Sequence, residues 1–201
     1  LAKYPKQLAK DLALLKKEKV DLVWTPSSAE IYPEDYETFV SLEKSAKKIE
    51  GHFRPSHFQG VTTIVTKLFN VIQPHIAYFG QKDAQQAYII QKMVKDLNFD
   101  IKIRILPIIR ENNGLALSSR NQYLTPAQKT QAALIYQSLQ KAKALFDKGQ
   151  TDANILQKTI QETLNTTFKI DYVKIVETST FNEVKNIKNK AYILIAAHLG
   201  N

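Results

Sequence analysis

Between residues 75 and 109, two short apolar runs flank a helical stretch, and this order restricts the fold more than any other feature of the sequence. The runs "HIAYF" (75–79) and "IKIRILPII" (101–109) have the length and content of buried strands. Residues 83–97 between them repeat apolar side chains at helical spacing, namely Ala87, Ile90, Val94 and Leu97. Strand, helix and strand of these lengths predict a right-handed parallel βαβ unit.

The sequence before residue 75 extends this pattern. Residues 5–17 carry leucines at helical spacing, and "VDLVW" (20–24) reads as a buried strand that Thr25-Pro26 ends. The segment 25–60 is rich in Pro, Ser, Glu and Lys and is expected to be irregular. Residues 61–73 are predicted to form an amphipathic helix that Pro74 stops, with one apolar face made by Val61, Ile64, Val65, Leu68, Phe69 and Ile72.

The sequence changes character after residue 120. Thr125-Pro126 has the N-cap and first-turn residues of a helix, predicted to run over 126–147 and to end near Gly149. Thr151 is expected to cap a second helix. Two strands are predicted to follow, "DYVKIVE" (171–177) and "AYILIAA" (191–197).

The predicted fold class is therefore α/β. We expect a Rossmann-like parallel sheet in residues 1–108, incomplete at its N-terminal side, and a second, smaller α/β C-terminal domain in residues 109–201. At 201 residues the chain is long enough for a sizeable core. It has no cysteine, which argues against a disulfide framework and fits a reducing cytoplasm, and no apolar run approaches the roughly 20 residues of a membrane span.

The formal charge of +9 permits a nucleic-acid partner, but the distribution of the basic residues argues against one. Most lysines fall on helical stretches such as "LLKKEK", where they are expected to be solvated, and no stacking aromatics interleave with them. Only four basic residues are arginine: Arg54, Arg104, Arg110 and Arg120.

Two loops carry residues suited to a phosphate. In "YFGQKDAQQ" (78–86), Gly80 is expected to let the backbone turn and approach a ligand, while Lys82 and Asp83 open a helix whose dipole favours an anion. The alternative is a glycine turn, an N-capping Asp83 and a solvated lysine. In "NNGLALSSRNQYL" (112–124), two hydroxyls and a guanidinium follow a glycine turn and suit an anion with several oxygens.

Both loops follow predicted parallel strands, so we expect them near one edge of the sheet, where doubly wound folds bind ligands. A third element, "GHFRPSHFQG" (51–60), places His52, Arg54 and His57 ahead of the 61–73 helix. A histidine there can act as acid, base or hydrogen-bond donor near neutral pH, or be structural. A metal site from His52 and His57 is not expected, because no cysteine or acidic cluster accompanies them.

Taken together, "RPSHFQGVTTIVTKLFNVIQPHIAYFGQKDAQQ" and "NGLALSSRNQYL" resemble the pantothenate synthetase family, and the resemblance runs from "YPKQLAKDL" to "YILIAAHLG". It implies a Rossmann-like nucleotidyltransferase fold and an enzyme that condenses pantoate with β-alanine. In that reaction ATP first adenylates pantoate, releasing pyrophosphate, and the amine of β-alanine then displaces AMP. It also implies Mg²⁺ as a cofactor, a cytoplasmic homodimer, and neither nucleic acid nor membrane as a partner.

The resemblance also implies roles for particular residues. Those implied to bind ATP are Gly80, Gln81, Lys82, Asp83, Ile109, Leu117, Ser118, Ser119 and Arg120. Those implied to contact pantoate or to lie at the edge of the site are Tyr4, His57 and Gln86. Those implied to act on the reacting groups are Lys82, Arg120, Ser118, Ser119 and His57. Asp11 is implied to lie close to the magnesium, although Lys10 stands where relatives often carry a second acid.

The sequence departs from the family's pattern at Ser56, Gln59, Gln81 and Ala84. It begins at Leu1 and has no match to the family's PTMG and H-x-G-H signatures, so it is expected to be a fragment that is inactive alone. Two other functions stay open: another nucleotidyltransferase of the same superfamily, and a non-catalytic basic module that binds nucleic acid.

Overall fold

The computed structural model describes residues 7–199, which separate into one unit up to Phe39 and a second from Val40 onward. The first unit contains helix α1 (Leu8–Lys17), which confirms the predicted first helix, and the single turn α2 (Ser28–Ile31). Ser27 starts α2 with a capping box, in which its hydroxyl accepts from the N–H of Glu30 and the Glu30 carboxylate accepts in return.

The predicted strand over residues 20–24 is wrong. These residues form no regular element, and the Leu22 side chain is 83% exposed. An apolar run becomes a buried strand only where a neighbouring strand can accept its hydrogen bonds, and no strand of the described chain pairs with it.

The predicted βαβ unit is confirmed. Strands β1 (Ile76–Gly80) and β2 (Lys102–Leu106) pair in parallel, in register from Ile76 with Lys102 to Gly80 with Leu106. Helix α5 (Ala84–Asp96) connects them, after the 3-10 turn η2 (Gln81–Asp83). Strand β2 is shorter than predicted and ends before Pro107, which has no N–H to donate to a neighbouring strand.

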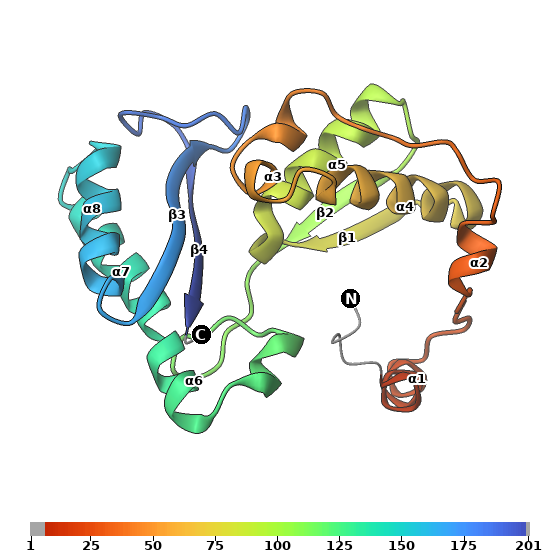
Figure 1. Ribbon diagram of the computed structural model, residues 1–201, viewed down its shortest axis with the longest axis horizontal. Coiled ribbons are helices and arrows are strands. Elements are labelled where there is room, and N and C mark those ends of the chain that lie inside the picture. The colour runs from red at the N-terminus through yellow and green to blue at the C-terminus, as the bar shows by residue number, and fades with distance from the viewer. Residues whose placement is uncertain (1–6, 200–201) are drawn as a thin grey trace. The chain divides into compact units, whose positions relative to one another are not determined.

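Helices α4 (His57–Ile72) and α5 cover one face of this sheet, as Figure 1 shows. The shared core is centred on Phe69, Ile90, Met93 and Val94, against which Ala77, Phe79 and Ile103 pack. Both strands alternate exposed and half-buried residues, because only one of their faces meets the helices. Of the stripe predicted for α5, Leu97 is an exception, being 50% exposed just beyond the end of the helix.

Helix α4 begins four residues earlier than predicted and buries two threonines as well as its apolar face. The hydroxyl of Thr62 donates to the Val40 carbonyl at 2.6 Å, and the hydroxyl of Thr63 accepts from the Val40 N–H at 3.0 Å. The two threonines thus satisfy both backbone groups of Val40. Between Val40 and α4, the chain forms the 3-10 turn η1 (Ser45–Lys47) and the single helical turn α3 (Glu50–Phe53).

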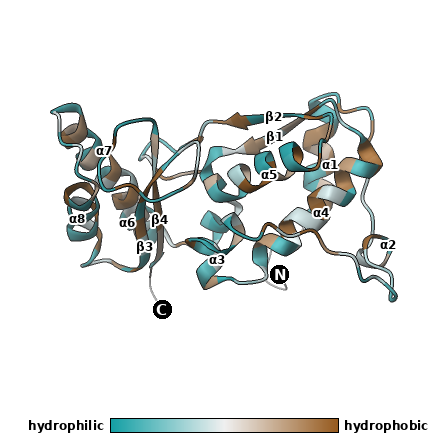
Figure 2. Cartoon of the chain, turned by 90° about the horizontal axis from the view of Figure 1, so that it is seen from above, coloured by the Kyte–Doolittle hydropathy of each residue, from teal (hydrophilic) through white to brown (hydrophobic). Residues whose placement is uncertain are grey.

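The C-terminal part has its own core and its own sheet. Strands β3 (Phe168–Glu177) and β4 (Ala191–Leu199) pair antiparallel, and helices α7 (Leu134–Asp147) and α8 (Ala153–Leu164) pack on one face of them (Figure 1). In Figure 2, α8 alternates between hydrophilic and hydrophobic colours along its length, as an amphipathic helix does. An α/β fold with a parallel sheet and a smaller C-terminal domain that contains an antiparallel sheet is therefore confirmed.

Two details of the predicted C-terminal helices are wrong. The single helix expected over 126–147 is two, α6 (Pro126–Ala132) and α7, although Ala133 between them keeps a right-handed helical backbone that apolar spacing does not distinguish. Asp152, rather than Thr151, caps α8, because its carboxylate accepts from two backbone N–H groups of the first turn. The predicted start at Thr125-Pro126 is confirmed by a capping box with Gln128.

Candidate active site

The two candidate phosphate loops leave the sheet at the same edge. Gly80 and Leu106 are register partners at the carboxyl ends of β1 and β2. The first loop begins directly after Gly80, and the second follows β2 through Ile109. Their shared origin confirms the expectation drawn from the sequence, because adjacent parallel strands end at one edge of a sheet.

Gly80 does not supply a turn. Its φ of −82° is one that any residue adopts, so the expectation that a glycine is needed for the backbone is wrong. A Cβ built at this position meets no atom within 4 Å. The position thus borders open space at the end of the strand, which leaves room for a ligand to approach the backbone closely.

Lys82 and Asp83 are both exposed at the start of α5, with Lys82 Nζ 3.7 Å from Asp83 Oδ1. Asp83 occupies the N-cap position, yet its carboxylate makes no capping hydrogen bond. Asp83 thus stands at the N-cap position, as in the alternative drawn from the sequence, but its exposed carboxylate is paired with Lys82 rather than with a backbone N–H of the first turn. Gln81, the remaining residue of η2, is half-buried.

The neighbouring residues Gln85 and Gln86 differ in their surroundings. Gln86, predicted to bind pantoate, is half-buried. Gln85 is 4% exposed, and its side-chain amide is hydrogen-bonded to the backbone of the segment that precedes α3. Sequence reasoning missed Gln85.

The second loop has a rigid base. Its turn requires Gly114, which has a φ of +91° and whose added Cβ would lie 2.2 Å from the Tyr136 ring. Arg110 donates to the Gly114 carbonyl at 3.1 Å and lies 4.2 Å over the same ring. Asn121 donates to Glu111 and to the carbonyl of Ala116, which closes the loop from its other end.

The 3-10 turn η3 (Ser119–Tyr123) follows in the same loop and carries the predicted phosphate ligands. The hydroxyl of Ser118 accepts from the N–H of Arg120 at 3.3 Å and starts the turn. Ser119 and Arg120 are exposed, and the Arg120 guanidinium forms no ion pair with any described carboxylate. Leu117 and Ile109 are also exposed, and the N–H of Leu117 donates to the Ile109 carbonyl at 2.9 Å.

His57 connects the two loops electrostatically. It opens α4, and its Nε2 lies 4.0 Å from Glu50 Oε1, which also accepts from Arg54 at 2.9 Å. Burial, followed by the positive charge of Arg54, lowers the pKa of His57 from its ordinary value, while Glu50 and Asp83 oppose this shift and Arg120 adds to it. His57 is therefore neutral near pH 7 and lies within the fields of both loops.

Glu50 was also missed by the sequence reasoning. Its position four residues before Arg54 is the spacing of an ion pair on a helix, and this spacing could have indicated it. His52, in contrast, packs edge-on against Phe53 and does not join this group.

Two predicted residues precede Val40, where the unit that carries both loops begins. Asp11 is exposed in the first turn of α1, within the unit that ends at Phe39. Tyr4 lies outside the described residues. Residues 7–199 contain no cluster of three or more His, Cys, Asp or Glu side chains that could hold a metal ion.

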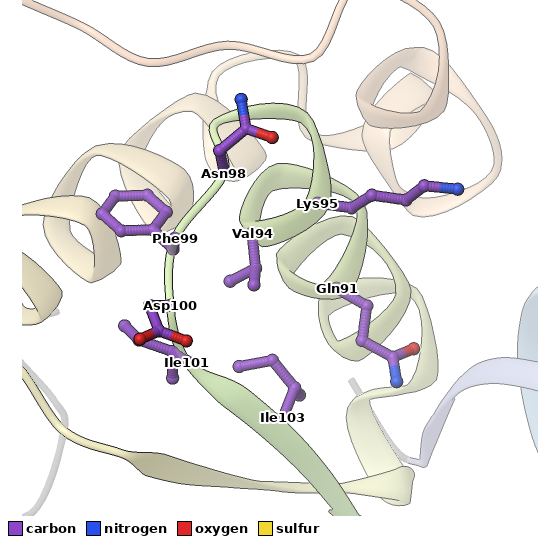
Figure 3. Close-up of a pocket in the computed structure, with 8 residues that line it drawn as sticks. All are labelled: Gln91, Val94, Lys95, Asn98, Phe99, Asp100, Ile101 and Ile103. Atoms are coloured by element: carbon purple, nitrogen blue, oxygen red, sulfur yellow. The ribbon is translucent and has the colours of Figure 1, made fainter.

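One hollow of the described chain is not part of this site. It measures about 550 Å³ and is formed where the chain turns from the end of α5 into the start of β2. Figure 3 shows Gln91, Lys95, Asn98 and Asp100 around it. It therefore lies at the amino end of β2, whereas sheets of this kind bind their ligands beyond the carboxyl ends.

Some of the lysines pair with a carboxylate four residues away, and three of these pairs lie within one helix each, as expected of solvated helix faces. Pairs four residues apart are Lys47–Glu43, Lys92–Asp96, Lys143–Asp147 and Lys158–Glu162. In residues 7–199, no helix is long and apolar enough to cross a membrane.

The chain is similar throughout its length to known enzymes. The sequence model of the pantoate-beta-alanine ligase family matches residues 1–201. Pantothenate synthetase of Acetivibrio thermocellus is 46% identical over 201 residues, which are 99% of this chain and 72% of the relative, and that of Thermotoga neapolitana is 48% identical over 200 residues. The crystal structure of pantothenate synthetase from Thermus thermophilus superposes with a TM-score of 0.93 at 37% identity, covering 98% of this chain and 72% of that one.

A further structure contains ligands. Pantoate-beta-alanine ligase from Francisella tularensis, complexed with beta-gamma ATP and beta-alanine, superposes with a TM-score of 0.73 at 31% identity, over 98% of this chain and 71% of that one.

Proposed function

The chain belongs to the pantoate-beta-alanine ligase family, and we propose that it condenses pantoate with β-alanine in an ATP-dependent reaction. The products are pantothenate, AMP and pyrophosphate, and a pantoyl adenylate is the intermediate. The observation that carries the proposal is the common origin, at one edge of the parallel sheet, of the Lys82–Asp83 loop and the Ser118–Arg120 loop. The other two functions, a different nucleotidyltransferase and a nucleic-acid module, are not favoured by the relatives.

We assign the nucleotide to the edge formed by Gly80 and Leu106. The open space at Gly80 admits the ribose, and the Asp83 carboxylate, which makes no capping hydrogen bond, accepts from its hydroxyls. The backbone at Ile109 faces the adenine, with Gln81 and Leu117 at the borders of the pocket. Lys82 contacts the phosphates at the start of α5, where the helix dipole also favours negative charge.

The first step is attack of the pantoate carboxylate on the α-phosphorus of ATP. A bond forms between carboxylate oxygen and phosphorus, and the bond from phosphorus to the bridging oxygen of pyrophosphate breaks. The carboxylate is already a nucleophile, so the protein only has to hold it in line, a task we assign to Gln86, His57 and Tyr4. Negative charge accumulates on the departing pyrophosphate, and Arg120 with Ser118 and Ser119 is placed to stabilise it.

In the second step the free amine of β-alanine attacks the acyl carbon, AMP departs and the nitrogen loses a proton. A neutral His57 can donate or accept a hydrogen bond here without adding charge to the site. We include Mg²⁺ in the proposal, with Asp11 as its protein ligand; bound with ATP, it would neutralise phosphate charge.

We also propose a domain boundary at residues 108/109, a homodimer and a cytoplasmic location. Separate cores beneath the two sheets support the boundary, and a smaller buried cluster joins Ala84 of α5 to Val176 and Phe181 across it. Limited proteolysis tests the domain boundary. Sedimentation velocity tests the homodimer, and cell fractionation tests the cytoplasmic location.

The decisive assay measures pyrophosphate release from ATP in the full protein with pantoate, with other hydroxy acids and with no acid. Release that needs pantoate, followed by AMP and pantothenate only when β-alanine is added, is the expected result. Equal pyrophosphate release with unrelated acids would indicate that the chain is a different nucleotidyltransferase. Salt-resistant binding of labelled RNA or DNA without any pyrophosphate release would favour the nucleic-acid module.

A further inference from the structure

We propose that Gln85 is a positioning residue for the reaction, because its buried amide fixes Glu50 and thereby holds His57 and Arg54 in place beside the nucleotide loop. The expected effect on the KM for pantoate rests on the proposed function. Gln85 itself touches neither pantoate nor ATP in this proposal.

The Gln85 amide makes three hydrogen bonds to one short stretch of backbone. Its Oε1 accepts from the N–H of Glu50 at 3.1 Å, and its Nε2 donates to the carbonyls of Ser45 at 3.1 Å and Lys48 at 2.8 Å. Both donors of the amide are used, and the side chain is 4% exposed. Loss of this amide would leave the Glu50 N–H without its partner, whereas the carbonyls of Ser45 and Lys48 would keep a backbone donor each, from Lys48 at 3.5 Å and from Gly51 at 2.8 Å.

The backbone segment that Gln85 contacts includes an unfavourable conformation. Ile49, directly before α3, has a φ of +44°, which is unfavourable for a β-branched residue. A conformation of this kind persists only where its surroundings enforce it. Gly51 adds a second constraint, since a Cβ there would lie 1.7 Å from the Ala46 carbonyl oxygen.

Gln85 also replaces a missing helix cap. Ile49 occupies the N-cap position of α3 and offers no side-chain acceptor, so the first N–H of the helix, that of Glu50, is satisfied by Gln85 from another element. The Glu50 carboxylate then accepts from Arg54 and lies 4.0 Å from His57 Nε2. A chain of contacts thus runs from the first turn of α5 to the first residue of α4.

The same turn of α5 directly follows Lys82 and Asp83 and includes Gln86. Gln85 therefore links the residues assigned to ATP with the His57 segment assigned to pantoate. The ATP loop begins at the paired ends of β1 and β2, whereas the Gln85 amide bonds only to the segment that leads to His57. Loss of the amide should accordingly disturb pantoate more than ATP.

The test compares Gln85→Met with Gln91→Met in the full protein. Methionine keeps the length of the side chain and removes its hydrogen bonds, and Gln91 is an exposed residue of the same helix. For Gln85→Met we expect the KM for pantoate to rise on the order of tenfold or more, with the KM for ATP within about twofold of wild type. Gln91→Met should match wild type in both constants.

A second readout is independent of catalysis. The charged groups acting on His57 are Glu50, Arg54, Asp83 and Arg120, and of these Glu50 and Asp83 raise its pKa. If Gln85→Met releases Glu50, the His57 pKa measured by NMR without substrates should move further down, and the Glu50 amide should exchange faster with solvent. His57→Gln identifies the resonance. A residue that only adds stability would lower the melting temperature without moving this titration.

The outcomes separate the two claims. Equal changes in both KM values with an unchanged His57 titration would overturn the positioning role, as would wild-type behaviour throughout. If the wild-type protein releases no pyrophosphate with pantoate, the proposed function fails, and the titration and amide exchange alone decide whether Gln85 fixes Glu50. Should Gln85→Met not fold, Gln85→Asn keeps an amide on a side chain one carbon shorter, and its constants and the exchange of the Glu50 amide decide instead.

Discussion

Replacing Arg120 with alanine distinguishes a phosphate ligand from a structural cation. Arg120 is exposed in η3 and forms no ion pair with a carboxylate of the described chain. A surface side chain without such a partner contributes within about 0.5 kcal/mol of stability. For a chain of this size that corresponds to a shift in Tm of no more than about 2 °C.

The catalytic loss should be far larger. One positioned donor that stabilises developing charge is worth on the order of 10²–10³ in rate, or about 2.7–4 kcal/mol, so Arg120→Ala should lose at least that in the adenylation step. Arg120→Lys should also be severe, because an ammonium keeps the charge but not the fork that grips two oxygens. If the grip tightens as pyrophosphate leaves, kcat should fall while ATP affinity changes little.

The assay is single-turnover adenylation and thermal unfolding on one preparation of each variant. Arg104 is a matched control, since it is an exposed arginine of β2 in neither phosphate loop, and Arg104→Ala should leave adenylation near wild type. A lowered Tm for Arg120→Ala, with adenylation per folded molecule nearly intact, would refute the reasoning. That result would mean that Arg120 ties parts of the protein together through a carboxylate.

Three further predictions concern other residues. Gln86→Ala should raise the KM for pantoate far more than that for ATP, and equal increases would remove its pantoate role. Thr62→Val should destabilise the fold by about 1–3 kcal/mol in urea unfolding, since the Val40 carbonyl loses its donor, whereas the exposed Thr130→Val serves as control; similar values for both would contradict this account. Because the folded-state pKa of His57 is depressed, its stability contribution is present above the unfolded pKa of about 6.5 and is lost as pH falls. In the variant His57→Gln, the free energy of unfolding should change less with pH between about pH 7.5 and 5.5 than in the wild-type protein. An unchanged pH dependence would show that another group is responsible.

The elements that sequence predicted well are those whose packing follows local periodicity. Helix α5 and the strands on either side of it each repeat apolar residues at the spacing of the element they form. Since parallel strands end at one edge, the order of strands and loops along the chain was enough to place the two loops together. The same reasoning failed at 20–24, because an apolar run carries no information about whether a partner strand exists.

The roles of single glycines and threonines could not be predicted. Gly80 looked like a turn and is extended, whereas Gly114 is required by the Tyr136 ring, which lies 22 residues further along the chain. Thr62 and Thr63 are polar residues in the buried face of α4, and only their bonds to Val40 explain why they are tolerated there. At Gly114, Thr62 and Thr63 the deciding contact joins residues that are distant in sequence.

The different roles of Gln85 and Gln86 could not be predicted from the sequence either. Adjacent residues of a helix point about 100° apart, so two identical side chains in one turn meet different surroundings. At Gln85 the surroundings are three backbone groups of a strained segment, and every donor of the amide is used. At Gln86 the side chain is only half-buried and can turn toward a substrate. A substitution to glutamate should therefore be tolerated by the fold at Gln86 and resisted at Gln85, where a carboxylate would face two carbonyl oxygens.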